Sequence, residues 1–98
     1  MKTSELTGAA LDWAVARCEG GVGENQLLGA WYAPSTDWAQ GGPIIEREKI
    51  TLEWTGENWC AYIRHDEEEF GTTPLIAAMR CYVASKLGDE VEIPEGVL

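Results

Sequence analysis

Apolar and polar positions recur with helical spacing at both ends of the chain. Between Thr7 and the glycine pair at 20–21, apolar side chains repeat every three or four residues and form one stripe: Leu11, Ala14, Val15 and Cys18. Thr7 suits the N-cap of a helix, and the glycine pair suits its end. The pattern predicts a first helix between these two signals.

The second helical pattern begins at Thr73-Pro74 and ends at Gly88, with threonine as N-cap and proline in the first turn. Its broad apolar face consists of Leu75, Ile76, Met79, Tyr82, Val83 and Leu87. The opposite side carries small side chains where a solvent-exposed face carries charged ones: Ala77, Ala78, Cys81, Ala84 and Ser85. We expect another layer of the chain or a second subunit to cover this side. In a homodimer, Ala77, Cys81 and Ala84 are the candidate interface residues.

Strand spacing fills the middle of the chain. Residues 50–54 and 59–64 alternate between apolar and polar, and the Gly56-Glu57-Asn58 sequence between them is typical of a turn. The pattern predicts an antiparallel hairpin in which Trp54 meets Trp59. Residues 27–32 predict a further strand or extended segment that stops before Pro34. The charged run 65–69 is expected to be a solvated loop.

The segment 35–48 is the most distinctive part of the sequence. Ser35 or Thr36 is expected to cap a short helical turn that the glycines at 41 and 42 then break. Pro43 suits the first position of a new helix, and a strand through 44–45 is the competing interpretation. We expect the whole segment to be ordered and buried, because its indole and two isoleucines require cover.

The same segment supplies the candidate ligand site. Hydroxyl, carboxylate, indole and amide groups follow one another closely here: Tyr32, Ser35, Asp37, Trp38 and Gln40. They fit either a small-ligand or enzyme site, or a structural role in which serine and aspartate cap a helix and the indole fills the core. No nucleophile–base pair, nucleophile elbow, phosphate loop or dinucleotide fingerprint accompanies them, so no catalytic residue is assigned and enzymatic activity stays open.

Net charge and tryptophan content limit the classes of molecule that the protein is expected to bind. The 98 residues fit one domain, and 17 acidic against 7 basic side chains give a net charge of −10. This charge excludes binding to nucleic acid through phosphates and favours a protein partner, although carboxylates along one face would imitate DNA. Five tryptophans accompany a single phenylalanine. Such a surplus indicates partly exposed rings at a groove or interface, with an all-core placement as the alternative.

Cysteine and histidine usage excludes several further classes. Three widely spaced cysteines without a C-x-x-C motif, and a single histidine, predict neither a disulfide framework nor a metal site, and no cofactor is expected. No apolar run approaches membrane-spanning length, and no apolar h-region follows Met1, so no leader is expected. The expected location is a reducing cytoplasm, without a membrane partner.

Three blocks of sequence, at 6–16, 34–48 and 73–91, resemble the NinX-like proteins, small proteins of unknown function from lambdoid phages and prophages. The resemblance implies a phage accessory protein made in the host cytoplasm, and it implies no activity, cofactor or catalytic residue. The blocks are also similar to small phage proteins with an α-β-α sandwich in which S-T-D opens a middle helix. The Gly41-Gly42-Pro43 sequence is predicted to interrupt that helix here.

Together these observations predict an α+β domain over 1–98, with a small, mainly antiparallel sheet and flanking helices, similar to an α-β-α sandwich. The expected function is a non-enzymatic accessory protein that binds a host or phage protein. A small-ligand or enzyme site around 35–40 and an acidic DNA mimic are the alternatives.

Overall fold

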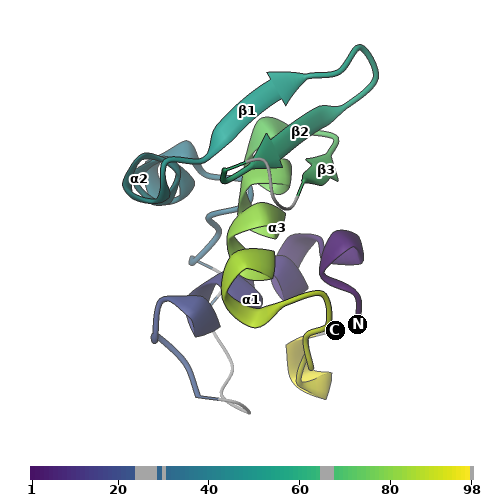
Figure 1. Ribbon diagram of the computed structural model, residues 1–98. Coiled ribbons are helices and arrows are strands. Elements are labelled where there is room, and N and C mark those ends of the chain that lie inside the picture. Colours follow the sequence, from purple (N-terminus) through teal and green to yellow (C-terminus); the bar gives the residue numbers. More distant parts are fainter. Residues whose placement is uncertain (24–28, 30, 65–67, 98) are drawn as a thin grey trace.

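The computed structural model describes residues 1–23, 29, 31–64 and 68–97, and these form an α+β domain (Figure 1). Its elements in chain order are η1 (Thr3–Glu5), α1 (Gly8–Cys18), α2 (Trp38–Glu48), β1 (Thr51–Trp54), β2 (Trp59–Tyr62), β3 (Glu69–Gly71), α3 (Pro74–Leu87) and η2 (Glu95–Val97). The predicted fold class, an antiparallel sheet with flanking helices, is confirmed. No helix in the described part has the length and apolar character needed to cross a membrane.

Helix α3 runs through the middle of the molecule and contacts the sheet, η1 and both other α-helices (Figure 1). The Thr73 hydroxyl accepts the backbone N–H of Ile76 at 3.1 Å, and Gly88 ends the helix at φ 84°. Both boundaries agree with the predicted caps. Because apolar elements surround it, the helix is buried on most sides, and its exposed residues lie in the last turn.

The small-residue side of α3 is covered within the single chain. Ala77, Cys81 and Ala84 are all buried, and the backbone of β3 supplies part of the cover. A Cβ atom on Gly71 would lie 2.6 Å from the backbone nitrogen of Ala77, so only glycine fits there. The close backbone approach expected from these small side chains therefore occurs inside the molecule. The face on which the predicted dimer contact depended is not free for a second copy.

The sheet is antiparallel with strand order β1-β2-β3. As predicted, Trp54 faces Trp59 across the hairpin, with ring centroids 5.5 Å apart. The pairing of β3 with β2, which sets Phe70 opposite Cys60, was not predicted. The prediction of a loop over 65–69 is wrong at Glu69, which begins β3, while residues 65–67 lie outside the described part. A strand of three residues with one large apolar side chain is too short to show alternation.

Helix α2 corrects the prediction of an interrupted segment. It continues through both glycines and Pro43, so neither the break at 41–42 nor the strand at 44–45 exists. The Asp37 carboxylate caps the helix, and packing explains the first glycine: a Cβ on Gly41 would lie 2.4 Å from the carbonyl oxygen of Pro34. Here glycine allows close packing instead of ending the helix.

The segment is ordered but only partly buried. Ile44 is buried, whereas the Trp38 side chain that was expected in the core is 54% exposed. The strand predicted over 27–32 falls largely outside the described residues, and Trp31 and Tyr32 at its end do not belong to a strand.

The two ends of the chain lie side by side (Figure 1). The Val91 N–H donates to the Met1 carbonyl at 2.9 Å, and the Met1 ammonium group donates to the Val91 carbonyl at 3.0 Å. The Thr3 hydroxyl also donates to the Gly88 carbonyl at 2.6 Å. The C-terminal tail is therefore docked against the start of the chain.

Candidate functional site

The amide and carboxylate of the predicted ligand site hold the chain in place. The Gln40 amide nitrogen donates to the Trp31 carbonyl at 2.9 Å and to Asp37 at 3.0 Å, and its oxygen accepts the Ala33 N–H at 2.8 Å. Asp37 also accepts the Ala39 N–H at 3.0 Å, as an N-cap does. These bonds fasten the segment 31–33 to the start of α2.

Ser35 is buried against a residue that sequence reasoning missed. Its N–H donates to the Asp12 carboxylate of α1 at 2.9 Å, and its hydroxyl lies beside that carboxylate without a hydrogen bond of good geometry. Burial raises the pKa of Asp12, and the two polar groups of Ser35 partly oppose the rise. A carboxylate between Leu11 and Trp13, both buried, was the available sequence signal for this contact.

The other two predicted residues lie apart from these hydrogen bonds. Tyr32 is half-buried and packs edge-on against Trp31, with ring centroids 5.8 Å apart. Trp38 borders a small cavity of about 200 Å³ between the starts of α2 and α3, together with Ser35. Its remaining lining residues are Thr36, Thr73, Pro74, Leu75 and Ile76. None of the seven carries a carboxylate, imidazole or thiol, so the cavity provides no general base. The structure therefore brings Ser35 and Trp38 together here, without Asp37 or Gln40.

The tryptophans divide into buried and exposed groups. Trp13 is in the core and Trp59 is half-buried, whereas Trp31, Trp38 and Trp54 are 77%, 54% and 56% exposed. The surplus of indoles is therefore partly exposed, and the all-core alternative is wrong. Trp54 and Trp59 pack together beside the hairpin turn, and Phe70, on the neighbouring strand β3, is 43% exposed. We call Trp54 and Trp59 the aromatic end of the sheet.

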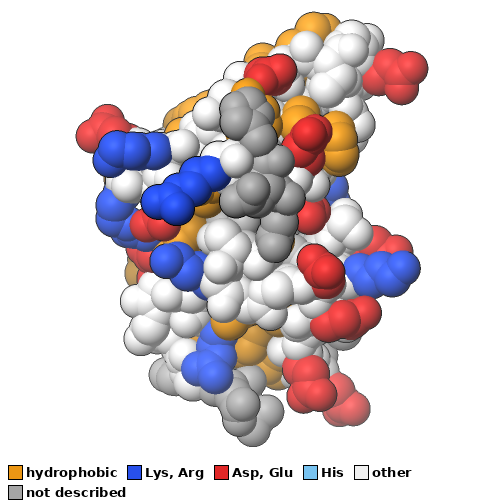
Figure 2. All heavy atoms as spheres, viewed as in Figure 1, with side chains coloured by type: hydrophobic (Ala, Val, Ile, Leu, Met, Phe, Trp, Pro, Cys, Tyr) orange, Lys and Arg blue, Asp and Glu red, His pale blue; other side chains and the backbone are white. Residues whose placement is uncertain are grey.

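The surface view shows how this region differs from the rest. Apolar side chains appear over the sheet at the upper end of the molecule (Figure 2). Below it, most of the visible Lys and Arg side chains are on the left and most of the Asp and Glu side chains are on the right. Among the described residues, no three His, Cys, Asp or Glu side chains gather closely enough to hold a metal ion.

Comparison with known proteins identifies the family. A family model described as bacteriophage P22 NinX matches residues 2–86. The chain belongs to the NinX family. The predicted resemblance is thereby confirmed, and the matched residues include all three helices except the last residue of α3, as well as the whole sheet. No curated protein matches the chain.

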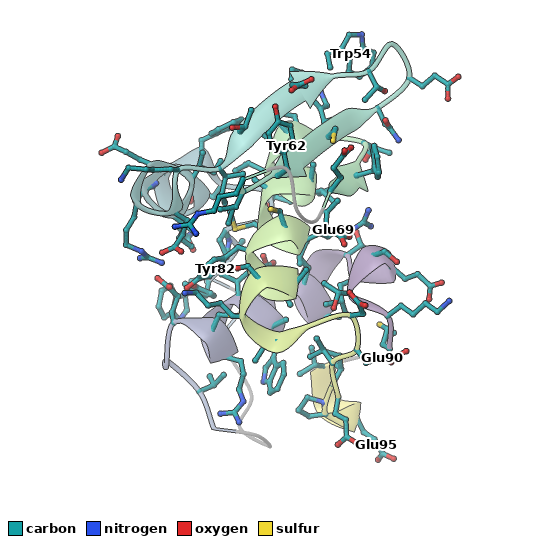
Figure 3. All side chains as sticks on the ribbon, in the orientation of Figure 1. Trp54, Tyr62, Glu69, Tyr82, Glu90 and Glu95 are labelled. Carbon is teal, nitrogen blue, oxygen red and sulfur yellow. The ribbon has the colours of Figure 1, made fainter. Side chains whose placement is uncertain are left out.

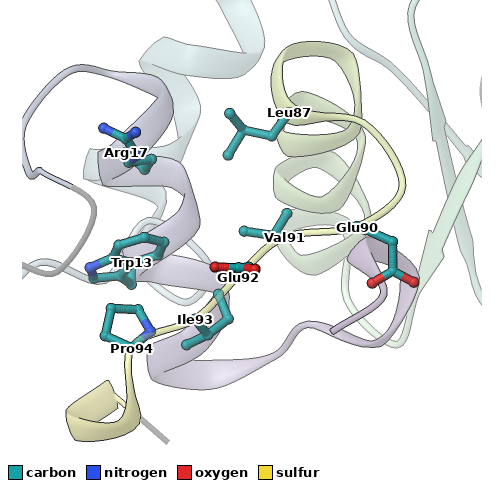
Figure 4. Close-up of a pocket in the computed structure, with 8 residues that line it drawn as sticks. All are labelled: Trp13, Arg17, Leu87, Glu90, Val91, Glu92, Ile93 and Pro94. Atoms are coloured by element: carbon teal, nitrogen blue, oxygen red, sulfur yellow. The ribbon is translucent and has the colours of Figure 1, made fainter.

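A further cavity lies mostly outside the NinX match. It has a volume of about 420 Å³ and separates α1 from the docked tail (Figure 4). Trp13 and Arg17 line it from α1, and its remaining wall consists of Leu87, Glu90, Val91, Glu92, Ile93 and Pro94. These six residues follow the matched range, so the family alone does not define this cavity.

A second polar cluster joins all three α-helices. Arg47 of α2 makes a two-pronged bond to Glu19, which follows α1, at 2.6 and 3.1 Å. The Tyr82 hydroxyl of α3 donates to the same carboxylate, and Arg47 also lies 5.7 Å from the centre of the Tyr82 ring (Figure 3). Hydrogen bonding to Arg47 lowers the pKa of Glu19, whereas burial and Glu19 raise the pKa of Tyr82. With these groups engaged in one another, the cluster acts as a structural clamp.

Proposed function

We propose that this NinX-family protein is a non-enzymatic accessory module that binds a host or phage protein in the host cytoplasm. The observation that carries the proposal is the aromatic end of the sheet. Trp54 is more than half exposed although its neighbour Trp59 offers apolar contact. Exposed indoles are enriched at protein interfaces because they bury a large area with few rotatable bonds.

Family membership supports a phage accessory role, and the contacts of the 35–40 segment support the non-enzymatic part of the proposal. Asp37 and Gln40 bond mainly to backbone groups, and the Ser35 N–H donates to the Asp12 carboxylate, which accounts for these residues without a ligand. A ligand site at Trp38 and Ser35 is the weaker alternative, since the cavity there is small, about 200 Å³.

The test removes one exposed indole at a time. Protein carrying Trp54→Ala, and a matched protein carrying Trp31→Ala, are used to capture partners from phage-infected host lysate beside the unchanged protein. A discrete partner should be retained by the unchanged protein and by Trp31→Ala, and be reduced about tenfold by Trp54→Ala, as for an interface hot spot. Equal capture by all three proteins would place the interface elsewhere.

A second candidate is an acidic DNA mimic, favoured by the distribution of carboxylates. Glu69, Glu90 and Glu95 follow one another down the right-hand side of the molecule (Figure 3). A row of carboxylates along one side could occupy a phosphate-binding surface of a DNA-binding protein. In this case the protein should displace duplex DNA from its captured partner. A partner that holds DNA and this protein at the same time would contradict mimicry.

A further inference from the structure

No helix of the described part covers the face of the sheet opposite α3, although Cys60 in the middle of that face is buried. Ala61 and Gly71 point to α3, so alternation places Glu53, Cys60 and Phe70 on the opposite side. Strand register aligns these three residues in a row, because Glu53 is opposite Cys60 and Cys60 is opposite Phe70. Among the described elements, only α3 packs extensively against the sheet. We call this row, with Tyr62 and Glu68 beside it, the outer face.

Two carboxylates on the outer face are held by uncharged donors. The Tyr62 hydroxyl donates to Glu53, and the Cys60 thiol donates to Glu68 at 3.2 Å. Burial and then Glu68 raise the pKa of Cys60 to about 11, and the bond to Glu53 raises the pKa of Tyr62. Both donors therefore remain protonated at neutral pH, and they position the carboxylates without neutralising them.

The charge of these two carboxylates is not compensated by any described cation. Within the described part of the chain, neither Glu53 nor Glu68 has a cation at ion-pair distance. Glu19 and Glu48, in contrast, are both paired with Arg47. The outer face thus combines negative charge with an exposed aromatic ring. Together the charge and the ring attract a flat organic cation.

Phe70 is held in position from behind. Its carbonyl accepts Nη1 of Arg80 at 2.6 Å, and Nε of the same side chain donates to the Leu6 carbonyl at 2.7 Å. Since Arg80 joins β3 to α3 and to the start of the chain, the backbone under the Phe70 ring has little freedom. A ligand that stacks on the ring then loses little entropy through ordering the protein.

We infer that the outer face binds an arginine side chain of a partner protein, stacked on Phe70 and hydrogen-bonded to Glu53 and Glu68. The inference rests on the proposed function and defines the partner as one that presents an arginine-bearing segment. The planar guanidinium can stack on the Phe70 ring, and its several N–H groups can donate hydrogen bonds to both carboxylates. A lysine ammonium offers a point charge and no flat surface.

The experiment uses a fluorescein-labelled peptide of alternating arginine and glycine, titrated with the purified protein and followed by fluorescence anisotropy. Binding should saturate, weaken at least about threefold with lysine in place of arginine, and vanish with citrulline, which keeps the shape and lacks the charge. Equal affinity for the citrulline peptide would overturn the inference.

Matched variants locate the site. Phe70→Leu keeps apolar bulk but removes the ring, and the pair Glu53→Gln and Glu68→Gln removes the carboxylate charge; each should weaken binding about tenfold. The control pair Glu92→Gln and Glu95→Gln removes the same charge from the tail and should change binding less than about twofold. An equal loss in the control pair would mean diffuse attraction, and self-association through the outer face would assign it to a second copy. Either result overturns the inference.

The outcomes also separate this inference from the proposed function. If Trp54→Ala removes partner capture while the arginine peptide fails to bind, the protein is a binding module whose partner has other chemistry. If capture is insensitive to Trp54→Ala and the peptide also fails, both proposals are wrong. Circular dichroism and thermal unfolding of each variant confirm that the fold is kept.

Discussion

Asp12 is buried in α1 with one oxygen accepting the Ser35 N–H, a contact that an uncharged amide could make equally well. Burial raises the pKa of this carboxyl above 3.8, the ordinary value of a solvated aspartate. A raised folded pKa means that ionisation favours the unfolded chain as the pH rises. The charge at Asp12 thus opposes folding at neutral pH, while the hydrogen bond supports it.

Two substitutions separate these effects. Asp12→Ala should destabilise the fold by about 1–3 kcal/mol, because the buried Ser35 N–H loses its acceptor. Asp12→Asn keeps the acceptor and should be neutral or stabilising at neutral pH. Any gain in the free energy of unfolding over the unchanged protein should vanish below pH 3.8, where Asp12 is protonated in both the folded and the unfolded chain. Urea unfolding across this range measures both, and an Asn variant as unstable as the Ala variant would contradict the assignment.

At the scale of elements, the clamp of Glu19, Arg47 and Tyr82 ties α1, α2 and α3 together. Hydrogen bonding to Arg47 lowers the pKa of Glu19 below 4.5, so its contribution is present above that value and is lost as the pH falls through the folded pKa. The Arg47 side chain is 50% exposed, and solvent screening limits the energy of the pair.

A double-mutant cycle of Glu19→Gln and Arg47→Gln should give a coupling energy of about 0.5–1 kcal/mol at neutral pH. The coupling should disappear as the pH is lowered well below 4.5, because protonated Glu19 no longer pairs with the guanidinium. Lys86→Gln serves as the control, since Lys86 lies 3.8 Å from Glu48 and is not hydrogen-bonded to Glu19. Coupling that persisted in acid would show that the contact is mainly packing against Tyr82.

The elements also show how far local sequence signals reach. Periodicity defined α1, although the side chain of its N-cap Thr7 makes no capping hydrogen bond. Caps and periodicity defined α3, and alternation defined the hairpin, because these signals act within a few residues. The continuity of α2 depends on Gly41 packing against Pro34, and β3 depends on pairing with β2; both are tertiary contacts without a local pattern. The exposed indoles were expected because composition alone indicates them. The outer face was not expected, because it combines side chains from three strands and the residue before β3, which only the tertiary structure brings together.

At the scale of the whole molecule, the net charge of −10 repels other polyanions such as DNA. Its Lys and Arg side chains are also engaged in part: Arg47 pairs with Glu19 and Glu48, and Arg80 bonds two carbonyls. We therefore expect no binding to duplex DNA, because 7 basic side chains, some of them already paired, do not offset the repulsion between 17 acidic side chains and the phosphates. A gel shift at low salt, where attraction would be strongest, provides the measurement. Salt-sensitive binding in the submicromolar range would contradict this expectation.

The pairing of Met1 with Val91 has a practical consequence for measuring any interaction. The two chain ends occupy one side of the molecule, whereas the hairpin extends from the opposite end (Figure 1). A handle fused to either terminus will therefore anchor the protein to a sensor in nearly the same orientation, with the sheet directed outward. Dissociation rates recorded from the two attachments should then agree, which gives an internal check that the sheet remains accessible.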